Sequence, residues 1–151
     1  MPAPAPLTLV IADDDIDYRL IIRYILQPVS DVMTVVGEAG DGEEALALVR
    51  RLRPDVLLTD LVMPRRDGIE ITRIVKRELP LTKVILMSSY TEDAYRLMAS
   101  DSGADAFVNK QVINSSLLPA IRDVMARRPA GGGGCLPPNG GASSSSASPP
   151  T

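Results

Sequence analysis

The chain has 151 residues, a formal net charge of −3 and no histidine. This length suits one ordinary domain, and about 125 residues can bury roughly two-thirds of their unfolded surface, enough for a core without disulfides. The missing histidine excludes histidine-based acid–base catalysis, Ser–His nucleophiles and histidine metal ligands. The chain is therefore neither a histidine kinase nor a histidine phosphotransfer protein, and its acidic charge argues against direct binding of nucleic acid.

The sequence also limits where the protein is expected to work. No apolar run reaches the roughly 18 residues needed to span a bilayer, and the N-terminus lacks a secretory signal. Cys135 is the single cysteine and cannot form an intramolecular disulfide. We therefore expect no membrane association and a reduced, cytoplasmic setting.

The first half of the chain alternates apolar runs with helical patterns. Residues 7–12 predict a buried strand, and residues 15–27 predict a helix that ends before Pro28. The apolar stripe expected on this helix consists of Ile16, Leu20 and Tyr24, with Ile21 and Ile25 beside them. Residues 32–36 predict a second strand that ends at Gly37. Asp41 and Gly42 then open a helix with acids in its first turn and arginines in its last, as the helix dipole favours.

The second half continues this alternation. A third strand over residues 56–59 ends on Asp60, and a loop to Gly68 leads into a helix over residues 69–79. A fourth strand over 84–87, a helix over about 91–102, a fifth strand over 106–108 and a last helix to about residue 128 follow. We expect the last helix to begin late, with Ser116 as N-cap, because Pro119 in a first turn removes no hydrogen bond.

Five alternations of strand and helix predict an α/β fold, a doubly wound five-stranded parallel sheet with helices on both faces. This is a flavodoxin-like three-layer sandwich. Residues 1–6 are expected to be an N-terminal extension and residues 7–128 the domain. Residues 129–151 are mostly Gly, Ser and Pro, which predicts a flexible tail or a linker stub.

Polar residues stand at the carboxyl ends of the predicted strands, where ligands bind in such sheets. Asp13 and Asp14 follow the first strand, Asp60 ends the third, Ser88 follows the fourth and Lys110 the fifth. Alone, each is explained by helix capping, a turn or a solvated charge. Together, the clustered carboxylates repel one another unless a cation binds among them. Their ligand atoms are all oxygens, which suits a hard ion such as Mg²⁺. A divalent ion beside a carboxylate and a lysine is a setting for phosphoryl transfer.

The segments VIADDD, TDLVMPRRDG, LMSSY and GADAFVNK resemble the receiver domain of response regulators, and the match covers about residues 7–128. With VVGEAGDGEEAL, the chain resembles the branch whose output is a helix-turn-helix DNA-binding domain. The resemblance implies a bacterial signalling domain phosphorylated by a sensor histidine kinase or phosphotransfer protein, and acting on an output protein or a missing output domain.

The resemblance also implies roles for single residues. Asp60 is the phosphoryl acceptor, and the metal ligands are Asp13, Asp14, Asp60 and the backbone carbonyl of Val62, for Mg²⁺ or in its place Mn²⁺. Lys110 pairs with the phosphoryl oxygens, and Ser88, with Ser89 beside it, responds to them. Phe107 stands where the family has an aromatic switch, although a core aromatic explains it equally well. Gln111 departs from the Lys-Pro pair of many relatives, which puts the geometry of that loop in question.

Other functions remain to be weighed against this resemblance. An aspartate-nucleophile phosphatase shares the Mg²⁺ site but uses a second aspartate as acid, where this chain has Val62. A receiver-like binding module that works without phosphorylation usually lacks the acceptor or the lysine, and this chain has both. If phosphorylation switches the domain, we expect the signal to leave through the face of the fourth helix, fifth strand and fifth helix, with a homodimer as one outcome.

Overall fold

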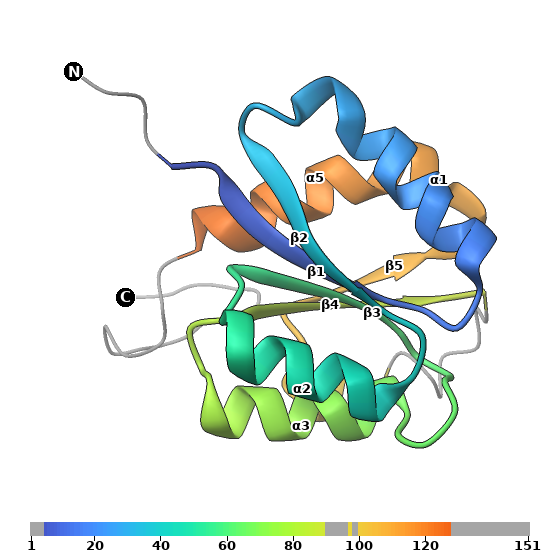
Figure 1. The fold of residues 1–151 in the computed structure, drawn as a ribbon, viewed down its shortest axis with the longest axis vertical. Coiled ribbons are helices and arrows are strands. Elements are labelled where there is room, and N and C mark those ends of the chain that lie inside the picture. Colours follow the sequence, from blue (N-terminus) through green and yellow to red (C-terminus); the bar gives the residue numbers. More distant parts are fainter. Residues whose placement is uncertain (1–4, 90–96, 98–99, 128–151) are drawn as a thin grey trace, which may run out of the picture.

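The computed structural model describes residues 5–89, 97 and 100–127. It contains a five-stranded parallel sheet of order β2-β1-β3-β4-β5 (Figure 1). The strands are β1 (Leu7–Ala12), β2 (Met33–Ala39), β3 (Val56–Asp60), β4 (Lys83–Ser88) and β5 (Ala106–Asn109). The helices are α1 (Ile16–Leu26), α2 (Gly42–Leu52), α3 (Gly68–Glu78) and α5 (Ile113–Ala126), with short 3₁₀ turns η1 (Gln27–Val29) and η2 (Lys110–Val112). The predicted fold class is confirmed.

Side-chain alternation along the strands divides the interior into a core on each face of the sheet. In β1, Leu9 and Ile11 join the core under α1 and α5, whereas Val10 and Ala12 join the core under α2 and α3. Figure 1 shows these helix pairs on opposite faces. Because all strands are parallel, their carboxyl ends share one edge, and the loops there carry the polar residues.

The structure corrects the predicted buried stripe of α1. Ile16, Leu20 and Tyr24 are 62%, 60% and 78% exposed, while Ile22 is fully buried and Leu26 nearly so. Only Asp17, Arg19 and Arg23 are charged among the eleven residues of this helix, so helical spacing of the others fits more than one face. The face of α1 that packs on the sheet is therefore a different one from the predicted face.

The end of β2 and the start of α5 also differ from expectation. Strand β2 continues through Gly37 to Ala39 because it stays paired with β1, and a Cβ on Gly37 would lie 3.2 Å from Leu52 of α2. Helix α5 begins at Ile113, not after Ser116, because η2 runs directly into it. Pro119 therefore lies inside α5, on an exposed position.

Two further expectations, the helix over residues 91–102 and the tail, concern segments that the structure describes only partly or not at all. Of the helix expected over residues 91–102, the described residues are 97 and 100–102, and the proposed tail from residue 129 lies outside the described residues. Among the described residues, no helix is long and apolar enough to cross a membrane.

Candidate functional site

The predicted polar residues meet at the carboxyl edge of the sheet. Asp13 directly follows β1, Asp60 ends β3, Ser88 ends β4 and Lys110 directly follows β5. The Lys110 ammonium lies 2.6 Å from Asp13 Oδ2 and 3.3 Å from Asp60 Oδ2. The side chains of all three are largely buried, Asp13 completely, so these charges interact with little screening by water.

Asp13, Asp14 and Asp60 form a carboxylate cluster. One oxygen of each lies within 4.8 Å of the others. Asp14 is exposed at the mouth of the cluster, while Asp13 Oδ1 accepts a hydrogen bond from the backbone N–H of Asp15 at 2.9 Å. Lys110 balances only part of the negative charge, and the oxygen-only donor set is the one that Mg²⁺ prefers. The residues present therefore fit such an ion.

Asp15, the next acid of the run, has a different place. Its side chain caps α1 by accepting hydrogen bonds from the backbone N–H groups of Asp17 and Tyr18. It is therefore occupied with the helix N-terminus and does not belong to the carboxylate cluster.

The electrostatic environment of Asp60 is unusual for a carboxylate. Its pKa is raised from an ordinary 3.8 to about 6, first by burial and then by the negative charge of Asp13. Lys110 and a backbone hydrogen bond from Val62 oppose it and favour the ionised form. At neutral pH the group is thus mostly ionised while remaining partly desolvated, which is a poised state for a nucleophile.

The remaining predicted site residues differ in how exposed they are to solvent. Ser88 is buried and pairs in register with Asn109 of β5, whereas Ser89 is exposed. Val62 lies in the loop after β3 and its side chain is half exposed. Phe107 packs beside a small core cluster under the β3–α3 loop, formed by Leu61, Ile69 and Leu86. Phe107 is partly buried there, and its role as a switch stays a prediction.

The loop after Lys110 has a regular local structure. It forms the turn η2, in which Asn109 Oδ1 accepts a hydrogen bond from the Gln111 N–H at 2.8 Å. No cis peptide bond occurs in the described part of the chain. Lys110 is thus presented to the site by a capped turn.

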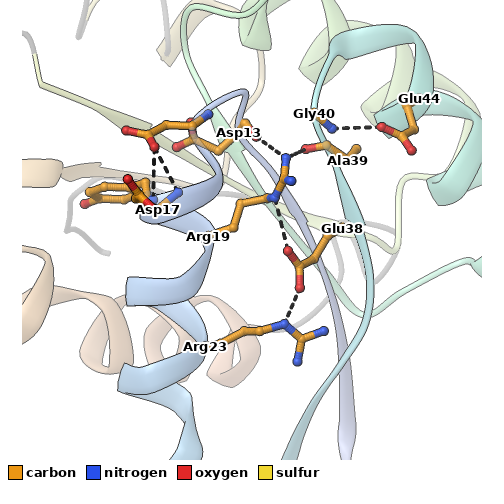
Figure 2. Close-up of polar contacts among 10 residues, drawn as sticks. Asp13, Asp17, Arg19, Arg23, Glu38, Ala39, Gly40 and Glu44 are labelled. Atoms are coloured by element: carbon orange, nitrogen blue, oxygen red, sulfur yellow. Dashed lines mark hydrogen bonds and ion pairs between the residues drawn. The ribbon is translucent and has the colours of Figure 1, made fainter.

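Two residues near the start of α1, Tyr18 and Arg19, make contacts that were not foreseen from the sequence. Tyr18 donates a hydrogen bond to the Lys110 carbonyl, and burial together with the charges of Asp13 and Asp60 raises its pKa to about 12. Arg19 donates to the carbonyls of Asp13 and Ala39, tying the ends of β1 and β2 together, and pairs with Glu38 (Figure 2). No signal in the sequence separates these residues from other aromatic and basic residues of an amphipathic helix.

Gly68 was predicted only as the end of a loop, but its missing side chain matters to the site. A Cβ at this position would lie 2.3 Å from the Asp60 carbonyl oxygen. The first turn of α3 can therefore pack directly against the end of β3, which fixes the backbone that carries Asp60.

The chain is similar in sequence to proteins of known family. The family profile of the response regulator receiver domain matches residues 9–122. Response regulator protein VraR of Staphylococcus saprophyticus is 38% identical over 117 residues, which make up 78% of this chain and 56% of that protein. The chain thus spans a little over half the length of this curated relative.

Solved structures agree in fold. The signal receiver domain of the response regulator NarL from Mycobacterium tuberculosis aligns with a TM-score of 0.77 and 33% identity, covering 83% of this chain and 100% of that one. A LuxR-family two-component response regulator from an Aurantimonas species aligns with a TM-score of 0.75 and 28% identity, covering 82% and 88%.

Proposed function

This chain belongs to the response regulator receiver domain family, and we propose that Asp60 is its phosphoryl acceptor. The chain is a receiver domain of two-component signalling, a phosphoacceptor module of a regulator family that is generally non-enzymatic. The observation that best supports the assignment of Asp60 is its position 3.3 Å from the Lys110 ammonium, within the carboxylate cluster that it forms with Asp13 and Asp14.

The transfer that we propose needs little chemistry from the protein beyond positioning. An Asp60 oxygen attacks the phosphorus of a phosphohistidine donor, an O–P bond forms, the P–N bond breaks, and the released imidazole takes up a proton. Lys110 holds the carboxylate in place and then pairs with a phosphoryl oxygen, while Ser88 and the Ser89 loop adjust to the new group. The donor is a sensor histidine kinase or a phosphotransfer protein.

We assign the cation site of this reaction to Asp13, Asp14, Asp60 and the Val62 carbonyl. Receiver domains bind Mg²⁺ through acidic residues, and this cluster offers only oxygen ligands. A bound Mg²⁺ supplies positive charge that neutralises the phosphoryl oxygens. Mn²⁺ accepts the same ligand types, and we expect it to replace Mg²⁺.

The output that we propose is a change of binding surface. Phosphorylation adds roughly 1.5 to 2 negative charges and three strong acceptor oxygens at Asp60. The response leaves through the face of β5, α5 and the helix expected over residues 91–102, toward an output domain, a partner protein or a second copy of the chain. An output domain of the helix-turn-helix type fits the resemblance in sequence.

Intact-mass measurement after incubation with acetyl phosphate tests the acceptor. With Mg²⁺ the wild type should gain a single phosphoryl group, and without Mg²⁺ or in Asp60→Asn it should gain none. Asp31→Asn is a matched control, because Asp31 is an exposed aspartate just before the start of β2, at the edge of the sheet opposite the site. An adduct that persists unchanged in Asp60→Asn would overturn the assignment.

A further inference from the structure

Tyr18 contacts Lys110 at both ends of that residue. The Lys110 ammonium lies 4.2 Å from the centre of the Tyr18 ring, and the Tyr18 hydroxyl donates a hydrogen bond of 3.2 Å to the Lys110 carbonyl. From these contacts we propose that Tyr18 is a positioning residue that holds Lys110 at Asp60. The inference rests on the proposed function of Asp60 as acceptor.

The ring contact differs in kind from the other contacts of the ammonium. Those are carboxylates, Asp13 at 2.6 Å and Asp60 at 3.3 Å, and both change during the proposed reaction. Asp60 becomes an acyl phosphate, and Asp13 shares its oxygens with a cation. The face of an aromatic ring attracts an ammonium through its quadrupole and keeps the same charge throughout. The contact between Tyr18 and Lys110 therefore stays the same during the reaction, whereas the contacts of Lys110 with the two carboxylates change.

The hydroxyl contact acts on the main chain. Lys110 opens the turn η2, where Asn109 caps the Gln111 N–H and the Tyr18 hydroxyl binds the Lys110 carbonyl. These hydrogen bonds come from different elements, one local and one from α1. Together they fix the backbone from which the lysine side chain extends.

Tyr18 is itself held close to the site. Asp15 caps the first turn of α1 and accepts from the Tyr18 backbone N–H, and the neighbouring Arg19 binds the carbonyls of Asp13 and Ala39. Figure 2 shows the Arg19 guanidinium reaching the ends of β1 and β2. The turn that carries Tyr18 is thus tied to the end of β1, where Asp13 lies.

Tyr18 also packs against the core under α1 and α5, so its test must separate positioning from packing. The lysines of the chain are Lys76, Lys83 and Lys110, which makes ¹³C-lysine labelling a direct probe. The Lys110 εCH₂ signal, assigned with Lys110→Arg, should be displaced upfield by the ring current in the wild type and in Tyr18→Phe. In Tyr18→Leu the signal should lose this upfield displacement. Tyr24→Leu, on the exposed face of the same helix, should leave it unchanged.

Phosphorylation rates test the consequence. With acetyl phosphate and Mg²⁺, Tyr18→Leu should slow adduct formation by roughly 3- to 30-fold, the range expected for a partly desolvated cation–π contact. Tyr18→Phe keeps the ring and should recover most of that loss. In a Lys110→Ala background, Tyr18→Leu should have no further effect, since the residue through which it acts is gone.

The outcomes separate the inference from the proposed function. A wild type that forms no adduct on Asp60 overturns the proposed function, whereas an undisplaced Lys110 signal in the wild type overturns the role of Tyr18. Equal rate losses from Tyr18→Leu with and without Lys110 also overturn it, because they indicate general damage to packing. The wild-type spectrum and Tyr18→Phe decide the matter even if the leucine variant does not fold.

Discussion

Asp14 and Asp15 are neighbours in the sequence with different surroundings. Asp14 contributes an oxygen to the carboxylate cluster, and Asp15 caps α1. We predict that Asp14→Ala strongly weakens Mg²⁺ binding with little loss of stability. Asp15→Ala should keep most of the Mg²⁺ affinity but lower the free energy of unfolding by about 1 kcal/mol through the lost cap. Titration calorimetry and urea unfolding of both variants measure the difference, and equal losses of affinity would contradict it.

The raised pKa of Asp60 makes stability depend on pH when no divalent cation is present. The folded protein holds this proton more tightly than the unfolded chain, so the free energy of unfolding falls as pH rises from about 4 through about 6. Asp60→Asn removes the ionisation and should stabilise the cation-free protein above pH 7. After allowance for solvent screening, the gain is about 1–2 kcal/mol.

Urea unfolding in a chelating buffer at pH 4.5 and pH 8 checks this prediction. The stability difference between Asp60→Asn and wild type should be small at the lower pH and larger at the higher. Asp31→Asn should show no such change, because its side chain is exposed. A difference that is the same at both pH values would contradict the explanation.

Some site residues could be predicted from the sequence and others could not. The ends of parallel strands share one edge of a sheet, so the short apolar runs alone were enough to bring Asp13, Asp60, Ser88 and Lys110 together. Tyr18 and Arg19 depend on how α1 is rotated about its axis. That rotation is set by packing over the whole sheet, and no local pattern in the sequence reports it.

At the scale of elements, the strands were predicted better than the faces of the helices. A buried strand of a parallel sheet is apolar throughout, so a short apolar run identifies it. Helix α1 has apolar residues around most of its circumference, and the predicted stripe of Ile16, Leu20 and Tyr24 is exposed. Burial of Ile22 and Leu26 instead follows from the shape of the core between α1 and α5.

Helix α5 shows a similar conflict between local rules and packing. A late start would suit Pro119, but Ile113 and Leu117 continue the buried face of Ile121 and Val124 toward the N-terminus. The hydroxyls of Ser115 and Ser116 donate back to the Val112 carbonyl and do not cap a later start. Burial of this face thus outweighs the cost of an internal proline.

This cost leads to a prediction for Pro119. The residue is exposed inside α5, where proline cannot donate a helical hydrogen bond. Pro119→Ala should raise the free energy of unfolding by about 1–3 kcal/mol, the penalty of proline in a helix interior less the entropy that proline removes from the unfolded chain. Thermal and urea unfolding measure it. A loss of stability would show that α5 does not continue through residue 119 in solution.

At the scale of the whole molecule, the site and the proposed output face share covalent and hydrogen-bonded connections. Lys110 opens the turn η2 that joins β5 to α5, and Ser88 pairs with Asn109, the residue before it. A displacement of Lys110 or Ser88 therefore acts directly on the backbone of both elements. Moving a two-state equilibrium from about 1:99 to 99:1 requires roughly 5.5 kcal/mol, which a few charge-assisted hydrogen bonds of about 1.5–3 kcal/mol each can supply.

From this connection we predict that beryllofluoride, a stable phosphoryl mimic, changes amide exchange beyond the site. With Mg²⁺ and beryllofluoride, protection should change along β5 and α5 as well as in the loops that touch Asp60, and sedimentation should report any accompanying self-association. Asp60→Asn should show none of these changes. Lys110→Ala should retain the changes near Asp60 but weaken those in α5, because the lysine side chain no longer connects the site to η2 and only the pairing of Ser88 with Asn109 remains. Changes limited to the loops around Asp60 in the wild type would mean that the domain takes up a phosphoryl group without switching this face, and so acts as a phosphate sink that competes for a kinase.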